Sequence, residues 1–145
     1  MKYYIRTLFM VLATVLLSSC LFHRQMSWLM EVEIVNNAPC FLIPADVKTR
    51  NHHMSNNGLM ISKWVDGSYQ TIWTAQIMGR KNHVSVIPGK CLVNDFDDWQ
   101  EGQYTIDTGI WFDSETDQRL YYAEFSLIRD PQTQQLKLSD QRRIK

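Results

Sequence analysis

Three cysteines, at positions 20, 40 and 91, carry the side chains of this chain that are best able to form new covalent or metal bonds. A cysteine thiolate can accept a lipid, pair with a second cysteine or ligate a metal ion. Which of these chemistries applies depends on the neighbouring residues and on the compartment, because disulfides persist only in oxidising surroundings. The residues before Cys20 indicate that compartment.

The first 19 residues have the composition of a cleaved secretory signal. Lys2 and Arg6 form a basic start, residues 8–17 are almost wholly apolar, and small residues follow. A basic lead, an apolar run of about 7–15 residues and small residues at the cut are typical of such signals. The run is shorter than the ~20 apolar residues of a transmembrane helix. We therefore predict a signal peptide at residues 1–19 that is removed on export.

Leu17-Ser18-Ser19-Cys20 resembles the bacterial lipobox, an aliphatic residue and two small residues before a cysteine. The resemblance implies cleavage after Ser19, lipid attachment to the Cys20 thiol and acylation of the new amino terminus. Two or more acyl chains anchor a protein stably in a membrane. Leu21 is not the Asp that commonly retains such lipoproteins in the inner membrane, so we expect the periplasmic face of the outer membrane. The alternative is an ordinary cleaved signal that leaves Cys20 as a free thiol.

Cys40 and Cys91 remain as a pair once Cys20 carries lipid, and the periplasm favours a disulfide between them. Closing a loop of about 50 residues stabilises a fold by roughly 4 kcal/mol in the chain-entropy model. The alternative is a metal site that combines these cysteines with some of three histidines, His52, His53 and His83. No C-x-x-C or H-x-x-x-H spacing supports a metal, so we predict the disulfide.

The charge balance argues against a nucleic-acid or membrane-surface partner. Of 145 residues, 126 remain after removal of residues 1–19, enough for one domain with its own core. The lost segment contains Lys2 and Arg6 and no acidic residue, so 13 of the 15 basic residues remain against 15 acidic residues, a net charge of −2. Without a basic patch, membrane contact is expected through the lipid alone.

No set of catalytic residues has the support of a motif. The chain lacks G-x-S-x-G, a phosphate-binding glycine loop and a zincin helix. Asp95, Asp97 and Asp98 suggest calcium, but the EF-hand spacing and its closing glutamate are missing. Paired carboxylates for glycoside hydrolysis are a three-dimensional feature that the sequence leaves open. We therefore expect a binding protein rather than an enzyme, with no cofactor, no metal and no small-molecule substrate.

The segment Asp95-Phe96-Asp97-Asp98-Trp99 is the main candidate for binding a partner. Acidic side chains steer and orient a basic partner, and a tryptophan can anchor an interface. Asp95, Asp97, Asp98 and Trp99 are therefore the candidate partner-binding residues. The alternative is a solvated loop in which Phe96 or Trp99 folds onto the core.

Period-2 alternation of apolar residues predicts that most of the chain after Ser27 forms β-strands. About nine short strands are expected, at residues 30–35, 40–43, 59–65, 69–78, 83–87, 91–93, 104–112, 121–128 and 136–138. Asp66-Gly67 is the strongest hairpin signal in the chain. The polar, aperiodic stretch 45–58 is expected to be a long loop, a common place for binding residues.

These elements predict an all-β fold, an antiparallel immunoglobulin-like β-sandwich of about 7–9 strands. Gly102-Gln103-Tyr104 is similar to the tyrosine corner of such domains, in which the tyrosine hydroxyl bonds to upstream backbone. The alternative to a tyrosine corner is a plain junction between a loop and a strand. The predicted organisation is the signal peptide at 1–19, a lipidated tether at 20–27, the β-sandwich at 28–140 and a charged tail at 141–145.

The motifs also follow one another in a familiar order: a lipobox, a Val-Glu-Ile-Val-Asn-Asn strand, Pro39 to Pro44 around Cys40, Pro88 to Val93 around Cys91, and Gly102-Gln103-Tyr104. This order resembles a family of small enterobacterial lipoproteins identified as type VI secretion immunity proteins of the periplasm. The resemblance covers most of residues 20–140. It implies an immunoglobulin-like domain that neutralises a periplasmic toxin by binding it. The alternatives are a periplasmic lysozyme inhibitor and an accessory lipoprotein of an envelope or secretion assembly.

Overall fold

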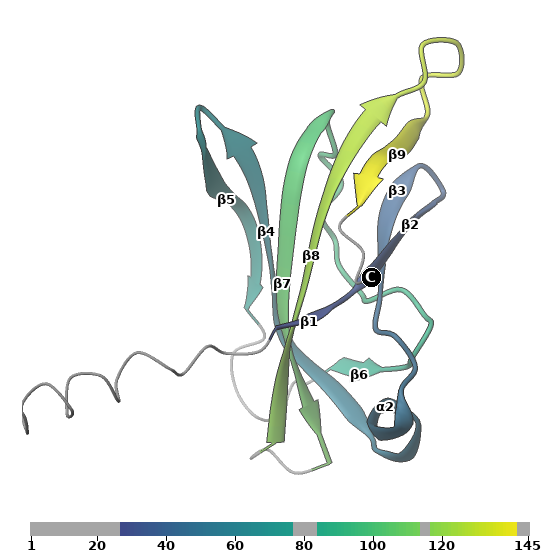
Figure 1. The fold of residues 1–145 in the computed structure, drawn as a ribbon, viewed down its shortest axis with the longest axis vertical. Helices are drawn as coiled ribbons and strands as arrows, with labels where there is room; N and C mark the ends of the chain where they lie inside the picture. The colour runs from purple at the N-terminus through teal and green to yellow at the C-terminus, as the bar shows by residue number, and fades with distance from the viewer. Residues whose placement is uncertain (1–26, 77–83, 114–116, 142–145) are drawn as a thin grey trace, which may run out of the picture.

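The computed structural model describes residues 27–76, 84–113 and 117–141, and within them the chain is mostly β-strand (Figure 1). The strands are β1 (Ser27–Leu29), β2 (Glu31–Val35), β3 (Ala38–Leu42), β4 (Met54–Val65), β5 (Ser68–Gln76), β6 (Val84–Val86), β7 (Gly102–Phe112), β8 (Asp117–Arg129) and β9 (Leu136–Gln141). A short helix, α2 (Val47–Asn51), lies between β3 and β4. The predicted all-β class is confirmed.

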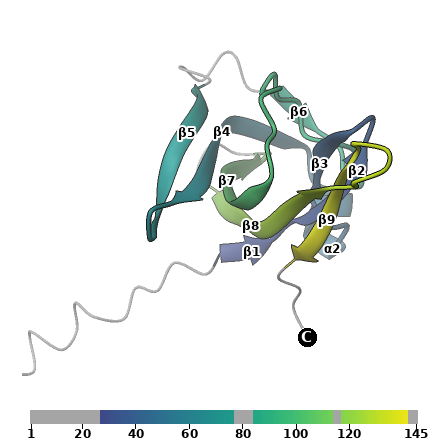
Figure 2. The ribbon, with the colours of Figure 1, turned by 90° about the horizontal axis from the view of Figure 1, so that it is seen from above.

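A seven-stranded sheet forms the larger layer of the described residues, with its main strands in the order β1-β8-β7-β4-β5. β9 also pairs with β8, and β6 also pairs with β4. The pairing of β1 with β8 is parallel, and the other pairings are antiparallel. The smaller layer is the antiparallel hairpin β2-β3. Seen from above, the large sheet curls around the interior, and β2 and β3 lie across its open side (Figure 2).

The core lies between these two layers and consists of alternate residues from the strands. On β8, alternate side chains from Tyr121 to Leu127 are buried, which is the period-2 pattern expected for a strand with one face toward a core. On β7, alternate side chains from Tyr104 to Phe112 are buried in the same way, and Thr105 and Gly109 of the other face are buried as well. The largest fully buried side chains include Phe41, Ile43, Ile61, Tyr104, Ile106, Ile110, Phe112 and Phe125. The two layers therefore form a β-sandwich, although its strands divide seven and two where an immunoglobulin constant domain divides them four and three.

Two hairpins have the backbone conformation that their turn residues favour. Asp66 and Gly67, between β4 and β5, have φ angles of 49° and 90°. Asn36 and Asn37, between β2 and β3, have φ angles of 51° and 62°. Positive φ at both central positions is typical of the type I′ turn, whose twist matches that of the flanking strands. The hairpin predicted at Asp66-Gly67 is confirmed.

The stretch 45–58 is not the long loop that its polar composition predicts. Asp46 begins α2 with a capping box, in which its carboxylate accepts the Thr49 N–H over 2.8 Å and the Thr49 hydroxyl accepts the Asp46 N–H over 2.6 Å. β4 then begins and pairs with β6 and β7 before its register shifts between Asn56 and Leu59. The bulge breaks the apolar alternation, so the pattern missed this part of the strand.

The boundaries of several segments also differ from those predicted. Ser27, the last residue assigned to the tether, lies in β1 and pairs with Leu120 of β8. Residues 91–93 form an isolated bridge between Cys91 and Leu42 rather than a strand. Gln141 belongs to β9 rather than to the tail. Cys20, the signal peptide and residues 142–145 lie outside the described residues.

The predicted disulfide is confirmed, and it fastens the smaller layer to the segment that follows β6. Cys40 of β3 is bonded to Cys91, 51 residues later in the chain. The Leu92 N–H donates to the Phe41 carbonyl over 2.8 Å and reinforces the junction. Because both sulfurs are used in this bond, neither cysteine is available as the metal ligand of the alternative hypothesis.

Candidate functional site

The segment Asp95–Trp99, which we call the acidic loop, lies between β6 and β7. Its charged and aromatic side chains lie in different environments. Asp95, Asp97 and Asp98 are exposed, whereas Trp99 is only 4% exposed and belongs to the core. The prediction that Trp99 anchors a partner is therefore wrong, because a side chain inside the core does not reach a partner's surface. The alternative, in which Trp99 folds onto the core, describes the loop correctly.

Trp99 packs in a cluster of aromatic rings drawn from both layers. Its ring centroid lies 4.6 Å from that of Phe96, 5.3 Å from Tyr104, 5.9 Å from Phe41 and 6.2 Å from Phe125. Tilted and edge-to-face contacts of this kind stabilise a core beyond simple area burial. The indole N–H is also satisfied, because it donates to the Phe96 carbonyl over 3.1 Å. The aromatic residues of the loop therefore fasten it to the core.

The predicted tyrosine corner is confirmed and fastens the loop a second time. The Tyr104 hydroxyl donates to the Gln100 carbonyl over 2.8 Å and accepts the Gln100 N–H over 3.2 Å. The Arg129 guanidinium of β8 donates to the Trp99 carbonyl over 3.1 Å. Tyr104 is fully buried, so water does not compete strongly for its hydroxyl. The three aspartates thus project from a backbone that is held on both sides of Trp99.

The exposed side chains of the acidic loop carry negative charge and hydrogen-bond acceptors. In the part of the chain that the structure describes, no group of three or more His, Cys, Asp or Glu side chains could hold a metal ion. Asp98 accepts a hydrogen bond from the side-chain amide of Gln100 over 2.8 Å. Calcium therefore gains no support from the arrangement of these aspartates.

The histidine pair His52 and His53 lies where α2 joins β4. Nδ1 of His52 lies 2.5 Å from Oδ2 of Asp113, and the His53 N–H donates to Oδ1 of the same carboxylate over 2.6 Å. The hydrogen bond to His52, followed by that from the His53 backbone, lowers the pKa of Asp113. Asp113 therefore connects the start of β4 to the end of β7, and His52 and His53 have a structural role as its partners.

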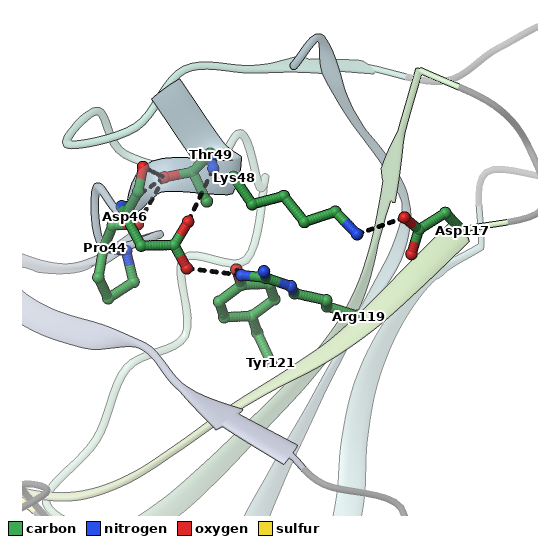
Figure 3. Close-up of polar contacts among 7 residues, drawn as sticks. All are labelled: Pro44, Asp46, Lys48, Thr49, Asp117, Arg119 and Tyr121. Carbon is green, nitrogen blue, oxygen red and sulfur yellow. Dashed lines mark hydrogen bonds and ion pairs between the residues drawn. The ribbon is translucent and has the colours of Figure 1, made fainter. Parts of the chain in front are cut away.

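A network of paired charges connects the start of α2 to β8 (Figure 3). The Arg119 guanidinium lies 2.6 Å from Oδ2 of Asp46, and Lys48 forms an ion pair with Asp117. Burial opposes ionisation of Asp46, but the Thr49 N–H and the Arg119 guanidinium outweigh it and lower the pKa of Asp46. Each of these four charges has a partner of opposite sign, so the network suits fold stabilisation better than acid–base chemistry.

A second group of polar and aromatic side chains lies on the outer face of the large sheet, away from the core. Strand register brings them together: Asp107 of β7 pairs with Met60 on one side and Tyr122 on the other, and paired residues share a face. Sequence reasoning did not single out this group, because its members come from five strands. We call it the outer-face patch, and it consists of Met60, Trp64, Tyr69, Asp107, Tyr122, Glu124 and Asp140.

Two tyrosine hydroxyls orient Glu124 within the outer-face patch. The Tyr122 hydroxyl donates to Oε2 over 2.6 Å, and the Tyr69 hydroxyl donates to Oε1 over 3.2 Å. Burial and the charge of Glu124 raise the pKa of Tyr69, so this hydroxyl keeps its proton. The Trp64 ring stands edge-on to Tyr69, with ring centroids 5.0 Å apart. The patch therefore presents a carboxylate framed by aromatic rings.

Asp107 differs from Glu124 because no hydrogen bond or ion pair to its carboxylate occurs among the described residues. Burial raises the pKa of Asp107. A carboxyl group whose pKa is higher in the folded than in the unfolded state destabilises the fold when it is ionised, and this cost disappears below the unfolded pKa. Asp107→Asn should therefore raise the melting temperature at pH 7 and change it little near pH 3, as measured by circular dichroism.

Glu124→Gln is the matched control for that measurement. It neutralises a carboxylate on the same face, but one that already accepts two tyrosine hydrogen bonds, so it should not raise the melting temperature at pH 7. A fall in melting temperature for Asp107→Asn would contradict the assignment of Asp107 as an unpaired charge.

The described residues contain no helix that is both long enough and apolar enough to cross a membrane. No family model, curated protein or solved structure matches the chain. The case for function therefore rests on the sequence and on two surfaces, the acidic loop and the outer-face patch.

Proposed function

We propose that the chain is a lipid-anchored periplasmic protein that binds a protein partner, and that it acts as an immunity protein against a type VI secretion effector. The observation that carries this proposal is the acidic loop, in which Asp95, Asp97 and Asp98 are exposed on a backbone fastened by Trp99 and Tyr104. A contact surface that is ordered before binding loses little conformational entropy on association. Its negative charge steers and orients a basic partner.

The rest of the chain suits a neutralising role, which requires no catalysis. Such a protein needs a durable scaffold, a contact surface and retention in the compartment where the toxin arrives. The Cys40–Cys91 disulfide supports the scaffold in an oxidising compartment. In this proposal the lipid on Cys20 holds the protein at the periplasmic face of the outer membrane, where two or more acyl chains give stable attachment.

The first experiment is capture of the partner. Lipidated protein purified from membranes is used to retain proteins from periplasm that has received type VI effectors, and mass spectrometry identifies what is bound. We expect one effector, whose toxicity falls when this chain is produced in the same periplasm. Retention and inhibition of lysozyme would instead favour a lysozyme inhibitor, and retention of envelope-assembly components would favour an accessory lipoprotein.

Replacing Asp95, Asp97 and Asp98 together with Asn should weaken binding of the captured effector by about tenfold or more, mainly through slower association. The change removes three negative charges and leaves the Trp99 packing in place. Calorimetry gives the affinity, and association rates at low and physiological salt show whether the lost interaction is one that salt screens.

The control for this triple variant is Glu31→Gln with Glu33→Gln, which removes charge from exposed positions of β2. This control should bind the effector as the natural protein does. Equal affinity of the aspartate triple variant and the natural protein would remove the loop from the contact surface.

A further inference from the structure

Strand β5 is an edge of the large sheet that lacks the usual protection against pairing with another chain. Among the described residues it pairs with β4 alone, and it lies at the outer margin of the sheet in both views (Figure 1, Figure 2). The free side of such a strand presents unpaired N–H and C=O groups. Its sequence, Ser-Tyr-Gln-Thr-Ile-Trp-Thr-Ala-Gln, contains no charged residue and no proline. Residues 68–75 are all exposed or half-buried, so this edge is open to a partner.

The other edge strands of the described residues are protected in the ways that natural sheets use. β1 and β6 have only three residues each. β2 and β9 carry charged side chains, and β3 contains Pro39. Short strands, charges and proline all oppose the addition of a further strand. With nine uncharged residues, β5 is therefore the edge best suited to accept one.

The last four residues of β5 form a regular part of this edge that lies beside the acidic loop. The register with β4 shifts at Ile72, which has no residue opposite it, and such a bulge bends the strand. After the bulge, Trp73–Gln76 pairs regularly with β4. The Trp73 ring centroid is 6.1 Å from that of Phe96, so the loop adjoins this part of the strand.

The acidic loop gives the edge a preference for a positively charged segment. Asp95 and Asp97 flank Phe96 in the sequence, and both are exposed. Among the described residues, no ion pair uses either of these carboxylates or that of Asp98. A strand added to β5 lies about 5 Å beyond it and directs alternate side chains to the face of the sheet that carries the loop. Basic side chains at those positions would pair with the aspartates.

We propose that an extended, basic segment of the protein partner adds to the large sheet along Trp73–Gln76 of β5. This inference rests on the proposed protein-binding function and specifies how the partner is held, by backbone hydrogen bonds to β5 and by charge pairs with the acidic loop. In this mode of recognition the backbone bonds supply affinity and the side chains select the partner. A second copy of this chain fits the edge less well, because antiparallel pairing of two β5 strands brings two acidic loops to the same face of the joined sheet.

The probe is the peptide acetyl-Lys-Thr-Val-Thr-Val-Lys amide, so the test does not require the partner to be known. Its β-branched residues favour an extended chain, and a lysine at each end places one near the loop whichever way the peptide runs. The peptide is added to the ¹⁵N-labelled, mature lipidated protein in an uncharged detergent, and nuclear magnetic resonance follows each backbone amide. We expect saturable shift changes in β5 and in the acidic loop.

Hydrogen exchange of the β5 amides distinguishes backbone pairing from attraction between side chains. Within Trp73–Gln76, successive N–H groups alternate between β4 and the free side. The two on the free side should exchange about tenfold more slowly when the peptide is present at about ten times its Kd. Unchanged exchange of both amides at saturation would overturn the proposal. Slow exchange that depends on protein concentration without peptide would show pairing of two copies and would overturn it as well.

Two altered peptides separate the contribution of the backbone from that of the charge. A peptide methylated on its four central amide nitrogens keeps the side chains and the charge but loses the N–H donors, so it should leave the exchange unchanged. A peptide with glutamate in place of both lysines should bind several-fold more weakly, because it meets the aspartates with like charge. Equal binding of the methylated peptide would refute strand addition, and equal binding of the glutamate peptide would refute the basic character of the segment.

Two matched substitutions on opposite edges of the sheet locate the site. Thr74→Lys places a positive charge on β5, and Ser139→Lys places the same charge on β9; both positions are exposed. Thr74→Lys should weaken binding of the lysine peptide several-fold, whereas Ser139→Lys should weaken it by less than about twofold. Circular dichroism checks that both variants are folded. Equal effects of the two substitutions would remove the site from β5.

Exchange in the captured complex separates strand addition from the immunity function. An effector whose binding leaves the β5 amides exchanging as in the free protein refutes strand addition alone. Slowed exchange with the lysine peptide, in a protein that captures no effector, refutes the immunity function alone.

Discussion

Trp99→Ala should lower the free energy of unfolding by about 3–5 kcal/mol, the usual cost of truncating a large aromatic side chain in a core. Trp99 is 4% exposed, and its ring lies within 6.2 Å of four other aromatic rings. The substitution leaves a cavity between the two layers and removes the indole hydrogen bond to Phe96. It should therefore loosen the acidic loop as well as the core.

The measurement is urea unfolding followed by far-ultraviolet circular dichroism. Tyr104→Phe should cost less, about 1–3 kcal/mol, because it removes the buried hydroxyl that bonds to Gln100 but keeps the ring. Asp97→Ala, beside Trp99 but exposed, should change stability by no more than about 0.5 kcal/mol. A Trp99→Ala protein of unchanged stability that no longer binds its partner would restore Trp99 as a surface anchor.

The features that the sequence predicted correctly depend on neighbours along the chain. The alternation on β7 and β8 identifies both strands and their buried faces, because side-chain direction in a strand reverses at every residue. Asp66-Gly67 identifies a hairpin because both residues tolerate positive φ. The Cys40–Cys91 disulfide could be predicted because the resemblance of residues 17–20 to a lipobox leaves Cys40 and Cys91 as the remaining pair.

The burial of Trp99 could not be predicted from its neighbours along the chain. Trp99 follows three aspartates within five residues, a composition typical of an exposed loop. Its actual environment is made by Phe41 and Phe125, which belong to strands far away in the sequence. Local composition indicates that a segment is a loop, but it does not show which surface of the sheet the loop covers.

The outer-face patch could not be predicted from the sequence for a related reason. Tyr69 and Glu124 are 55 residues apart, and they meet only through the register of β5 on β4, β4 on β7 and β7 on β8. A slip of one residue in any pairing would move one of them to the inner face. Because β4 contains two register shifts, its partner residues on β5 and β7 cannot be deduced by counting along the sequence.

Replacing Cys40 and Cys91 together with Ala should lower the free energy of unfolding by about 4 kcal/mol, as expected for closure of a loop with a separation of 51 residues. That is a large part of the roughly 5–15 kcal/mol that stabilises a typical domain. The disulfide reinforces a junction that is otherwise held by the bridge between Cys91 and Leu42 and by the backbone bonds from Leu92 to Phe41 and from Gly89 to Ile43.

The natural protein in a thiol reductant is the matched control, since it opens the same bond without changing the sequence. Its urea midpoint should fall to that of the double-alanine variant, and the variant itself should not respond to the reductant. Equal midpoints for the oxidised and reduced natural protein would contradict a stabilising role for the bond. If the role holds, a chain made without residues 1–19 and kept in the reducing cytoplasm should resemble the double-alanine variant, because the bond persists only in an oxidising compartment. If the protein is exported as proposed, its fold would reach full stability only after transfer to an oxidising compartment.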